Sequence, residues 1–269
     1  MMRPDVKEIT EKLEQGVKDV FTSDKYMEYL KFMGKFHNYS FNNCVLIMMQ
    51  MPTATLVAGY KAWQTKFGRQ VRKGERGIKI LAPCPHKKTI ETEDGDEEEI
   101  RWTSFRTTTV FDVSQTDGDD LPTGCTNRLT GDVDGYDDLL SKLAEIAPVS
   151  VNFDEIEGSA NGYYSRVEEQ IVVQHGMSEQ QTVKTLVHEI AHAVLHSEDG
   201  EESEADRFTK EVQAESVAYT VCSALGLDTS DYSFGYVAGW SSDKDMKELT
   251  ASMEVIRKTA ANLIDRLAA

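Results

Sequence analysis

Three side chains within five residues of this sequence have the types and spacing that a hydrolytic metal centre requires. In "LVHEIAHAVLH", residues 186–196, His188 and His192 stand four positions apart and Glu189 follows the first of them. Side chains four apart on a helix lie one turn above each other, so both imidazoles can reach one Zn²⁺ at about 2.0–2.1 Å. Glu189 projects past that metal, where it can act as the general base of a hydrolysis. We therefore predict His188 and His192 as metal ligands and Glu189 as the catalytic residue.

A catalytic zinc also needs a third protein ligand and an open fourth position. Glu211 and Glu215, in "KEVQAESVAY" at residues 210–219, stand four apart and so share one face of a second helix. We predict Glu211 as the third ligand and Glu215 as the acceptor that orients a ligand histidine, and the reverse assignment stays open. His196 continues the four-residue spacing, but we interpret it as a partly buried helix-end residue, since a tetrahedral site is complete without it.

The elements around these residues must hold them in place. Ser178 and Gln181 form an S-x-x-Q capping box, which predicts a helix that begins there and runs through His196. We interpret "QIVVQ", residues 170–174, as an edge strand that could pair with an extended substrate. The apolar stripe that the helix is expected to bury consists of Val183, Leu186, Val187, Ile190, Ala191 and Val194. The tyrosines that could stabilise an oxyanion are Tyr163, Tyr164, Tyr219 and Tyr236.

Charge is divided unevenly along the chain. The net charge is −17, yet residues 1–90 hold 16 Lys and Arg against 8 Asp and Glu, and the remaining residues hold 13 against 38. Such asymmetry indicates a nucleic-acid-binding part joined to a different part. The stretch "ETEDGDEEE", residues 91–99, contains seven acidic residues, and we interpret it as a solvated hairpin tip or insertion.

Aromatic and amide side chains alternate with the basic residues of the first third. Bases stack on aromatic side chains with about 1–3 kcal/mol each and without sequence preference, which suits single-stranded nucleic acid. We therefore predict single-stranded DNA (ssDNA) as a partner, while a core role for Phe41 and Trp63 stays open. The predicted contacts are Tyr39, Asn42, Asn43, Trp63, Lys66, Arg69, Arg72, Lys73 and Arg76.

Apolar periodicity and turn residues predict a two-domain α+β fold. We expect residues 1–116 to form the first domain, with helices at 4–20, 24–36, 40–50 and 61–67 and strands at 78–82 and 101–113. Residues 117–134 are rich in Gly, Asp and Thr and are predicted to be a linker. Residues 135–269 form the second domain, with helices at 135–147, 178–196, 206–225 and 243–267 and strands at 149–153 and 162–174.

Several classes of protein are excluded by composition. The longest apolar run, residues 44–49, is too short to cross a membrane, and the polar start "MMRPDVKEITEKLEQ" is no secretory signal. The four cysteines, Cys44, Cys84, Cys125 and Cys222, lie far apart and are interpreted as reduced thiols. We therefore expect a cytoplasmic protein.

The sequence resembles the ArdC-like antirestriction proteins over residues 35–240. The first-half motifs that carry the resemblance are, in order, N-Y-S-F-N-N, Q-M-P-T-A-T, A-G-Y-x-x-W, G-R-x-V-x-K-G-E-x-G-I and V-F-D-V-S-Q-T. In the second half, H-E-I-A-H followed by E-x-x-x-E is similar to the zinc metallopeptidase domain of that family, which is related to the ImmA/IrrE peptidases. The same matching places His188, His192 and Glu211 at ligand positions and Glu189 at the catalytic one. Glu215 departs from the family pattern, because some relatives have Asn at this position.

The resemblance implies an ssDNA-binding domain joined to a zincin-like (gluzincin) metallopeptidase domain. It also implies a protein of a mobile genetic element that protects incoming DNA from restriction. Two other functions stay open. One is an ImmA/IrrE-like regulatory protease that cleaves a repressor without binding DNA, and the other is a non-catalytic DNA-binding shield with structural zinc.

Overall fold

The computed structural model describes residues 4–21, 23–91, 97–119, 135–227, 234–235 and 237–269. It has a mixed α+β fold that divides into two compact units, so the predicted fold class is confirmed. One unit comprises residues 1–16 and 45–121, and the other comprises residues 17–44 and 122–269. This grouping differs from the predicted division at 117–134, because residues 17–44 pack with the C-terminal half. Strand β5 (Thr116–Gly118) includes the first residues of the predicted linker, and residues 120–134 lie outside the described ones.

The first unit is built around a three-stranded antiparallel sheet of order β1-β4-β3. Its strands are β1 (Val57–Gly59), β3 (Ile78–Glu91) and β4 (Glu97–Asp112), and β5 pairs separately with β2 (Arg69–Val71). Helix α4 (Tyr60–Phe67) ends at Gly68, whose φ of 62° is left-handed, a backbone conformation that glycine adopts readily at the end of a helix. Helices α1 (Pro4–Val20) and α3 (Phe41–Gln50) contribute residues to both units.

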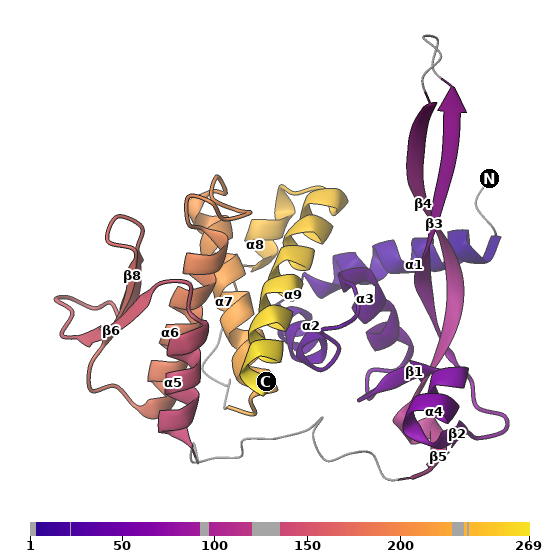
Figure 1. Ribbon diagram of the computed structural model, residues 1–269, viewed down its shortest axis with the longest axis horizontal. Coiled ribbons are helices and arrows are strands. Elements are labelled where there is room, and N and C mark those ends of the chain that lie inside the picture. The colour runs from indigo at the N-terminus through magenta and orange to yellow at the C-terminus, as the bar shows by residue number, and fades with distance from the viewer. Residues whose placement is uncertain (1–3, 22, 92–96, 120–134, 228–233, 236) are drawn as a thin grey trace. The chain divides into compact units, whose positions relative to one another are not determined.

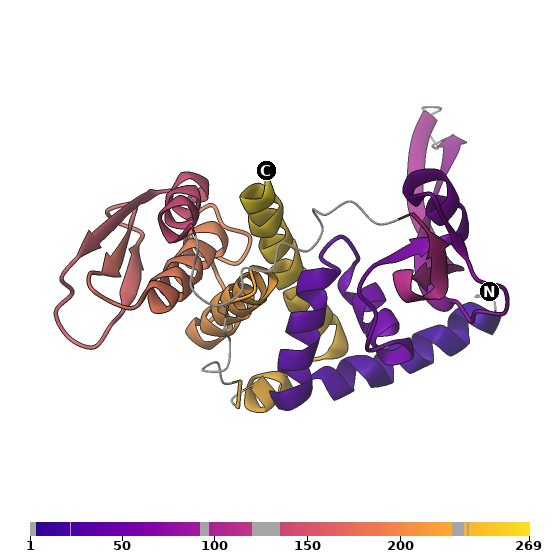
Figure 2. The ribbon, with the colours of Figure 1, turned by 90° about the horizontal axis from the view of Figure 1, so that it is seen from below.

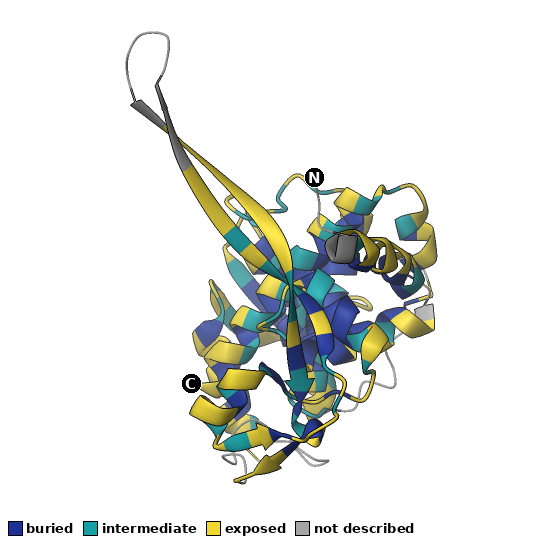
Figure 3. Ribbon diagram, turned by 90° about the vertical axis from the view of Figure 1, so that its right-hand side faces the viewer, coloured by how far each residue is buried: buried dark blue, intermediate teal, exposed yellow. Residues whose placement is uncertain are grey.

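Strands β3 and β4 form a long ribbon with exposed side chains (Figure 3). Trp102 is 49% exposed and stacks on His86 of the neighbouring strand, and Phe105 is 55% exposed. The acidic residues 91–98 lie where no side chain is described, so their predicted role as a solvated tip stays a prediction.

The second unit places one helix between a sheet and a second helix. The sheet has the order β6-β8-β7, with β6 (Ser150–Asp154), β7 (Gly162–Ser165) and β8 (Gln170–Gln174). Helix α6 (Glu179–Leu195) packs on β7 and β8 on one side and on α7 (Arg207–Ala224) on the other (Figures 1 and 2). The remaining helices are α2 (Ser23–Lys35), α5 (Tyr136–Ile146), α8 (Val237–Ser242) and α9 (Met246–Ala268).

Two expectations about the strands of this unit were wrong. The single strand predicted at 162–174 is two strands joined by a turn, in which Glu169 has a φ of 49°. Strand β8 is the centre of the sheet rather than an edge, since it pairs with β6 and with β7. Its backbone groups are therefore occupied, and β7 is the edge strand beside α6.

Two further observations concern the described residues only. None of their helices is long and apolar enough to span a bilayer. Cys44, Cys84 and Cys222 are free thiols, whereas Cys125 falls in the segment that is not described.

Candidate metal centre

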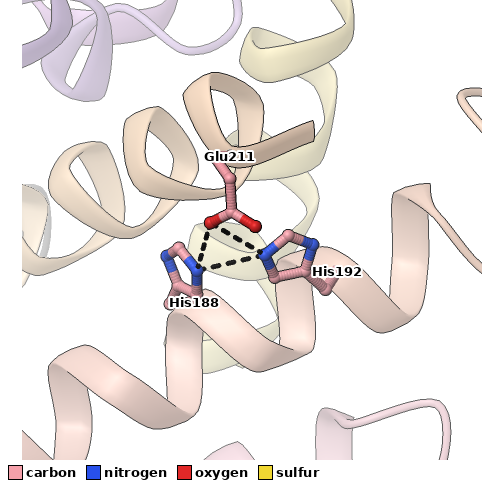
Figure 4. Close-up of side chains that lie close together, drawn as sticks. All are labelled: His188, His192 and Glu211. Atoms are coloured by element: carbon pink, nitrogen blue, oxygen red, sulfur yellow. Dashed lines mark hydrogen bonds and ion pairs between the residues drawn. The ribbon is translucent and has the colours of Figure 1, made fainter. Parts of the chain in front are cut away.

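Three donor side chains converge between α6 and α7 (Figure 4). His188 and His192 project from α6 with their Nε2 atoms 3.1 Å apart. Oε2 of Glu211, from α7, lies 3.6 Å from Nε2 of His188 and 3.7 Å from Nε2 of His192. The structure therefore brings together the three predicted ligands.

The separations of these donors fit a divalent metal ion. Tetrahedral bonds of about 2.0–2.1 Å put neighbouring ligand atoms about 3.3–3.4 Å apart, and the three observed separations lie on either side of that value. Two imidazole nitrogens and one carboxylate oxygen are also the donors that catalytic zinc sites use. Three protein ligands leave a fourth tetrahedral position for a reactant.

Helix α6 presents the histidines because its start and its buried face are both determined locally. Ser178 is the N-cap, and its Oγ accepts from the backbone N–H of Gln181. The Gln181 side chain donates to Thr185 instead of closing the predicted capping box. Five of the six stripe residues are fully buried, but Val194 is 37% exposed and Leu195 takes its place. The stripe turns the two histidines toward α7.

Helix α7 is held at its start by Asp206. The carboxylate of this N-cap accepts from the backbone N–H and from the hydroxyl of Thr209, and these bonds lower its pKa. Glu211 follows one turn into the helix, with its side chain 51% exposed, and Glu215 follows one turn later. The pKa of Glu211 lies far below its ordinary value because the carboxylate lies against the imidazole of His188 and, second, that of His192.

Glu215 lies behind His188, on the side away from the other donors. Its Oε2 is 3.2 Å from Nδ1 of His188, while Lys184 lies 3.7 Å from its other oxygen. Burial opposes the protonation of His188, but Glu211 and Glu215 outweigh burial and raise the pKa of His188 to about 9. In this arrangement Glu215 approaches only the far side of the His188 ring, whereas Glu211 faces both histidines, as the predicted assignment requires.

A buried polar chain continues behind His192. Nδ1 of His192 lies 2.8 Å from Nδ1 of His196, and Nε2 of His196 lies 2.9 Å from Oε1 of Gln213. The Gln213 amide nitrogen donates to Glu202 and Ser252, so its oxygen must face His196. Burial lowers the pKa of His196 to about 4, which keeps this ring neutral.

The hydrogen positions along this chain follow from Gln213. His196 must donate from Nε2 to the Gln213 oxygen, so its Nδ1 is an acceptor. His192 must then donate from Nδ1, and its Nε2 lone pair is left facing Glu211 and His188. His196 is the helix-end residue that we predicted, but it is 3% exposed rather than partly buried, and its ring contacts that of His192. Only the repeated four-residue spacing pointed to it, and nothing in the sequence pointed to Gln213.

Glu189 lies beside the donors and under β7. It is 8% exposed, and burial raises its pKa, although the two ligand histidines and the backbone N–H of Tyr164 favour its charged form. The strand can approach because residue 162 is glycine. A Cβ at Gly162 would lie 2.6 Å from Cγ2 of Thr185 and 3.4 Å from Cγ of Glu189.

These side chains open into a cavity of about 650 Å³ within this unit. Tyr163 and Tyr164 line it, so both remain candidates for stabilising an oxyanion. Tyr219 is 4% exposed and packs edge-on against Phe234, which rules it out as a cavity-lining residue. Tyr236 lies outside the described residues.

Among the predicted nucleic-acid contacts, the prediction for Trp63 was wrong. Its side chain is 0% exposed, packs against Phe67, and donates from Nε1 to the carbonyl of Phe111. It belongs to the core cluster with Ala58 and Val71, so it offers no face to a base. The alternative core role considered for Trp63 is the one observed.

Two of the predicted arginines form hydrogen bonds and ion pairs within their own unit. Arg69 donates to the carbonyls of Thr116, Gly118 and Asp119 and to the Thr116 hydroxyl. Arg72 pairs with Glu75 at 2.8 Å and donates to the Ser114 carbonyl. These bonds join β2 to the segment after β4 and leave little of either guanidinium for a phosphate.

The other predicted contacts divide between the two units. Lys66, Lys73 and Arg76 are exposed on the first unit. Tyr39, Asn42 and Asn43 are half-buried and belong to the second unit.

Comparisons with known proteins agree with this two-part organisation. Residues 6–111 match the family model of the N-terminal domain of anti-restriction factor ArdC, and residues 144–262 match the IrrE N-terminal-like domain, a peptidase family. An uncharacterized protein of Bacillus anthracis is 28% identical over 306 aligned positions, which cover 99% of this chain and 52% of that protein. The chain thus spans about half the length of this curated relative.

The solved structures that match are crystal structures of the antirestriction protein ArdC from plasmid R388. The metal-free structure is 23% identical, covers 86% of this chain and 85% of its own, and has a TM-score of 0.54. The Mn(II)-bound structure is 22% identical, covers 90% and 98%, and has a TM-score of 0.48.

Fold and site together define a two-domain α+β protein with a peptidase-family domain. The two family matches show that this chain is similar to the ArdC-like antirestriction proteins in both of its parts, which confirms the resemblance found in its motifs.

Proposed function

We propose that this ArdC-like protein is a zinc metallopeptidase whose N-terminal part binds ssDNA. The observation that carries the peptidase proposal is the convergence of His188, His192 and Glu211 beside the buried carboxylate of Glu189. The match to a peptidase family over residues 144–262 supports it. Its proposed setting is the cytoplasm of a cell that receives a mobile genetic element, with a protein as the peptide substrate.

Each residue of the site has a chemical task in this proposal. Zinc, when bound by the three donors, polarises a peptide carbonyl and acidifies water. Glu189 accepts the proton of the attacking water and passes it to the leaving amine, and burial favours this exchange because it raises the pKa of the carboxyl. Strand β7 is the edge strand at the cavity. Apart from the N–H of Tyr164, which donates to Glu189, the backbone groups of its outer edge can pair with an extended peptide.

A metal-content measurement tests the ligand set. Glu211→Ala should lower the bound zinc, measured by mass spectrometry of the purified protein, far more than Glu198→Ala does. Glu198 is an exposed residue of the acidic loop before α7 and provides the matched control. Equal zinc in both variants would overturn the ligand assignment, and manganese in place of zinc would overturn the choice of metal.

Substitution of the general base separates hydrolysis from a structural metal. Glu189→Gln should retain zinc and lose cleavage of a pooled peptide library by about 10²–10⁴-fold. If protection of DNA from restriction is lost in parallel, the protein acts as a peptidase. If protection survives in this variant, the zinc is structural and the protein is a DNA-binding shield.

The ssDNA proposal rests on the basic first third and on the ArdC N-terminal domain match. Lys66, Lys73 and Arg76 are its exposed cations among the predicted contacts. Fluorescence anisotropy of labelled single-stranded and duplex DNA over a salt series tests it. Tight single-strand binding with a steep salt dependence is expected, because phosphate contacts release counterions. Absence of binding at low salt would favour the repressor-cleaving protease.

A further inference from the structure

Basic side chains are concentrated in the cavity that holds the metal donors. Residues 135–269 contain 10 Lys and Arg against 25 Asp and Glu. Three of the ten, Arg166, Arg207 and Lys210, line this cavity, whereas only two of the acids, Glu189 and Glu211, do so. Both of those acids already have a task at the metal centre. The remaining charge of the lining is therefore positive within a strongly acidic domain.

Two of the three cations are available to a ligand. Lys210 donates to the carbonyl of Ser203 at 2.5 Å and is half-buried, so it is engaged within the protein. Arg166 and Arg207 are exposed, and neither has an ion pair or hydrogen bond to another residue in the described part of the chain. Arg257 differs from these two, because it forms an ion pair with Glu254 at 2.6 Å.

One of these two arginines lies next to the edge strand β7, and the other lies on the helix that carries Glu211. Arg166 directly follows β7, the edge strand beside Glu189. Arg207 is the first residue of α7 and stands one turn before Glu211, on the same face of the helix. A peptide that lies along β7 and reaches the metal donors would meet both guanidinium groups, which bind carboxylates through paired hydrogen bonds.

We propose that the cavity selects peptide segments that carry Asp or Glu side chains near the bond to be cleaved, through Arg166 and Arg207. This inference rests on the proposed peptidase function and adds its substrate class. An acidic peptide fits better than a neutral one because the two arginines are the unengaged charges of the lining.

Binding to a variant that retains its metal donors tests the proposal without turnover. The probes are two labelled peptides of one length and sequence, one with Glu and the other with Gln at the same positions. Full-length Glu189→Gln protein loaded with zinc should bind the Glu peptide more tightly, by roughly fivefold for each exposed ion pair of up to about 1 kcal/mol. Arg166→Gln with Arg207→Gln should remove this preference.

The control variant removes two positive charges at positions outside the cavity. Lys258 and Arg266 are exposed on α9 and do not line the cavity, so Lys258→Gln with Arg266→Gln should leave the preference intact. An equal loss of preference in both double variants would overturn the proposal, since net charge alone would then explain it. A second outcome would also overturn the proposal. If oligothymidylate binds more tightly than the Glu peptide, displaces it, and needs the same two arginines to do so, then these arginines bind nucleic-acid phosphates.

A cleavage assay with the zinc-loaded protein distinguishes failure of the proposed acidic selectivity from failure of the proposed peptidase function. If both peptides are cut equally and the arginine variant cuts as well, hydrolysis stands and the selectivity is overturned. If neither peptide is cut but the arginine-dependent preference persists, the acidic-peptide site stands and the proposed hydrolysis fails.

Discussion

The metal centre and the basic segment around α4 and β2 use their polar side chains in opposite ways. On α6 and α7, His188, His192 and Glu211 converge with their donor atoms and line one cavity. Near β2, Arg69 and Arg72 turn back onto carbonyls and carboxylates of their own unit. The comparison teaches that a cluster of charges along the chain becomes a ligand site only if the fold leaves those charges facing a shared space.

The two regions also differ in how aromatic and imidazole rings are supported. The two histidines of the candidate metal centre have polar partners behind them, Glu215 for His188 and His196 for His192. Trp63 has apolar partners, and its one polar atom is bonded to a backbone carbonyl. The first environment orients a ring for a ligand, whereas the second uses the ring to stabilise the fold.

The largest expected effect tests the assignment of Trp63 to the core. Trp63→Ala should lower the free energy of unfolding by about 3–5 kcal/mol, because it empties a fully buried site. Trp102→Ala is the matched control, since that ring is 49% exposed, and it should cost about 0.5 kcal/mol or less. Urea unfolding followed by circular dichroism measures both. A small loss at Trp63 would return it to the list of candidate stacking residues.

The next effect tests whether His196 orients His192. His196→Leu removes the acceptor for Nδ1–H of His192 and should weaken zinc binding by about 10–100-fold. His196→Asn supplies an oxygen in place of that nitrogen and should restore most of the affinity. Competition with a chelator gives both constants, and the spectrum of the cobalt-substituted protein reports the ligand geometry. Equal weakening in the two variants would mean that His196 only fills space.

A smaller expected effect is the dependence of zinc affinity on pH. His188 has a pKa of about 9 in the metal-free protein, so below pH 9 a metal ion must displace its proton. The affinity for zinc should therefore rise about tenfold per pH unit as pH increases toward 9, and should level off above it. Zinc competition at several pH values measures this slope. Glu215→Gln removes one of the carboxylates that raise the pKa and should flatten the slope near neutral pH. An unchanged slope in that variant would contradict the coupling.

The smallest effect separates free from engaged cations in the basic segment. Lys73→Ala and Arg76→Ala should each reduce the slope of log affinity for ssDNA against log salt by about 1, as expected for one lost phosphate contact. Arg72→Ala should leave the slope unchanged, because Glu75 and the Ser114 carbonyl occupy its guanidinium. The reverse pattern would show that DNA displaces these internal bonds.

Residues close together in the sequence were the ones whose arrangement could be predicted. The helical repeat alone sets the direction of side chains four residues apart, so the pairs on α6 and α7 could be recognised as faces before any fold was known. Gly68 likewise ends α4 for a local reason, its left-handed backbone. The family resemblance, too, came from ordered local motifs.

What only the tertiary structure decided depends on contacts between distant segments. Strand order made β7 rather than β8 the edge, because pairing partners come from elsewhere in the chain. Packing against Phe111 buried Trp63, and residues 17–44 joined the C-terminal unit. Gln213 meets His196 from another helix, 17 residues away. Local spacing determines which way a side chain leaves its own helix, but the free energy of burial across the whole fold decides what that side chain meets.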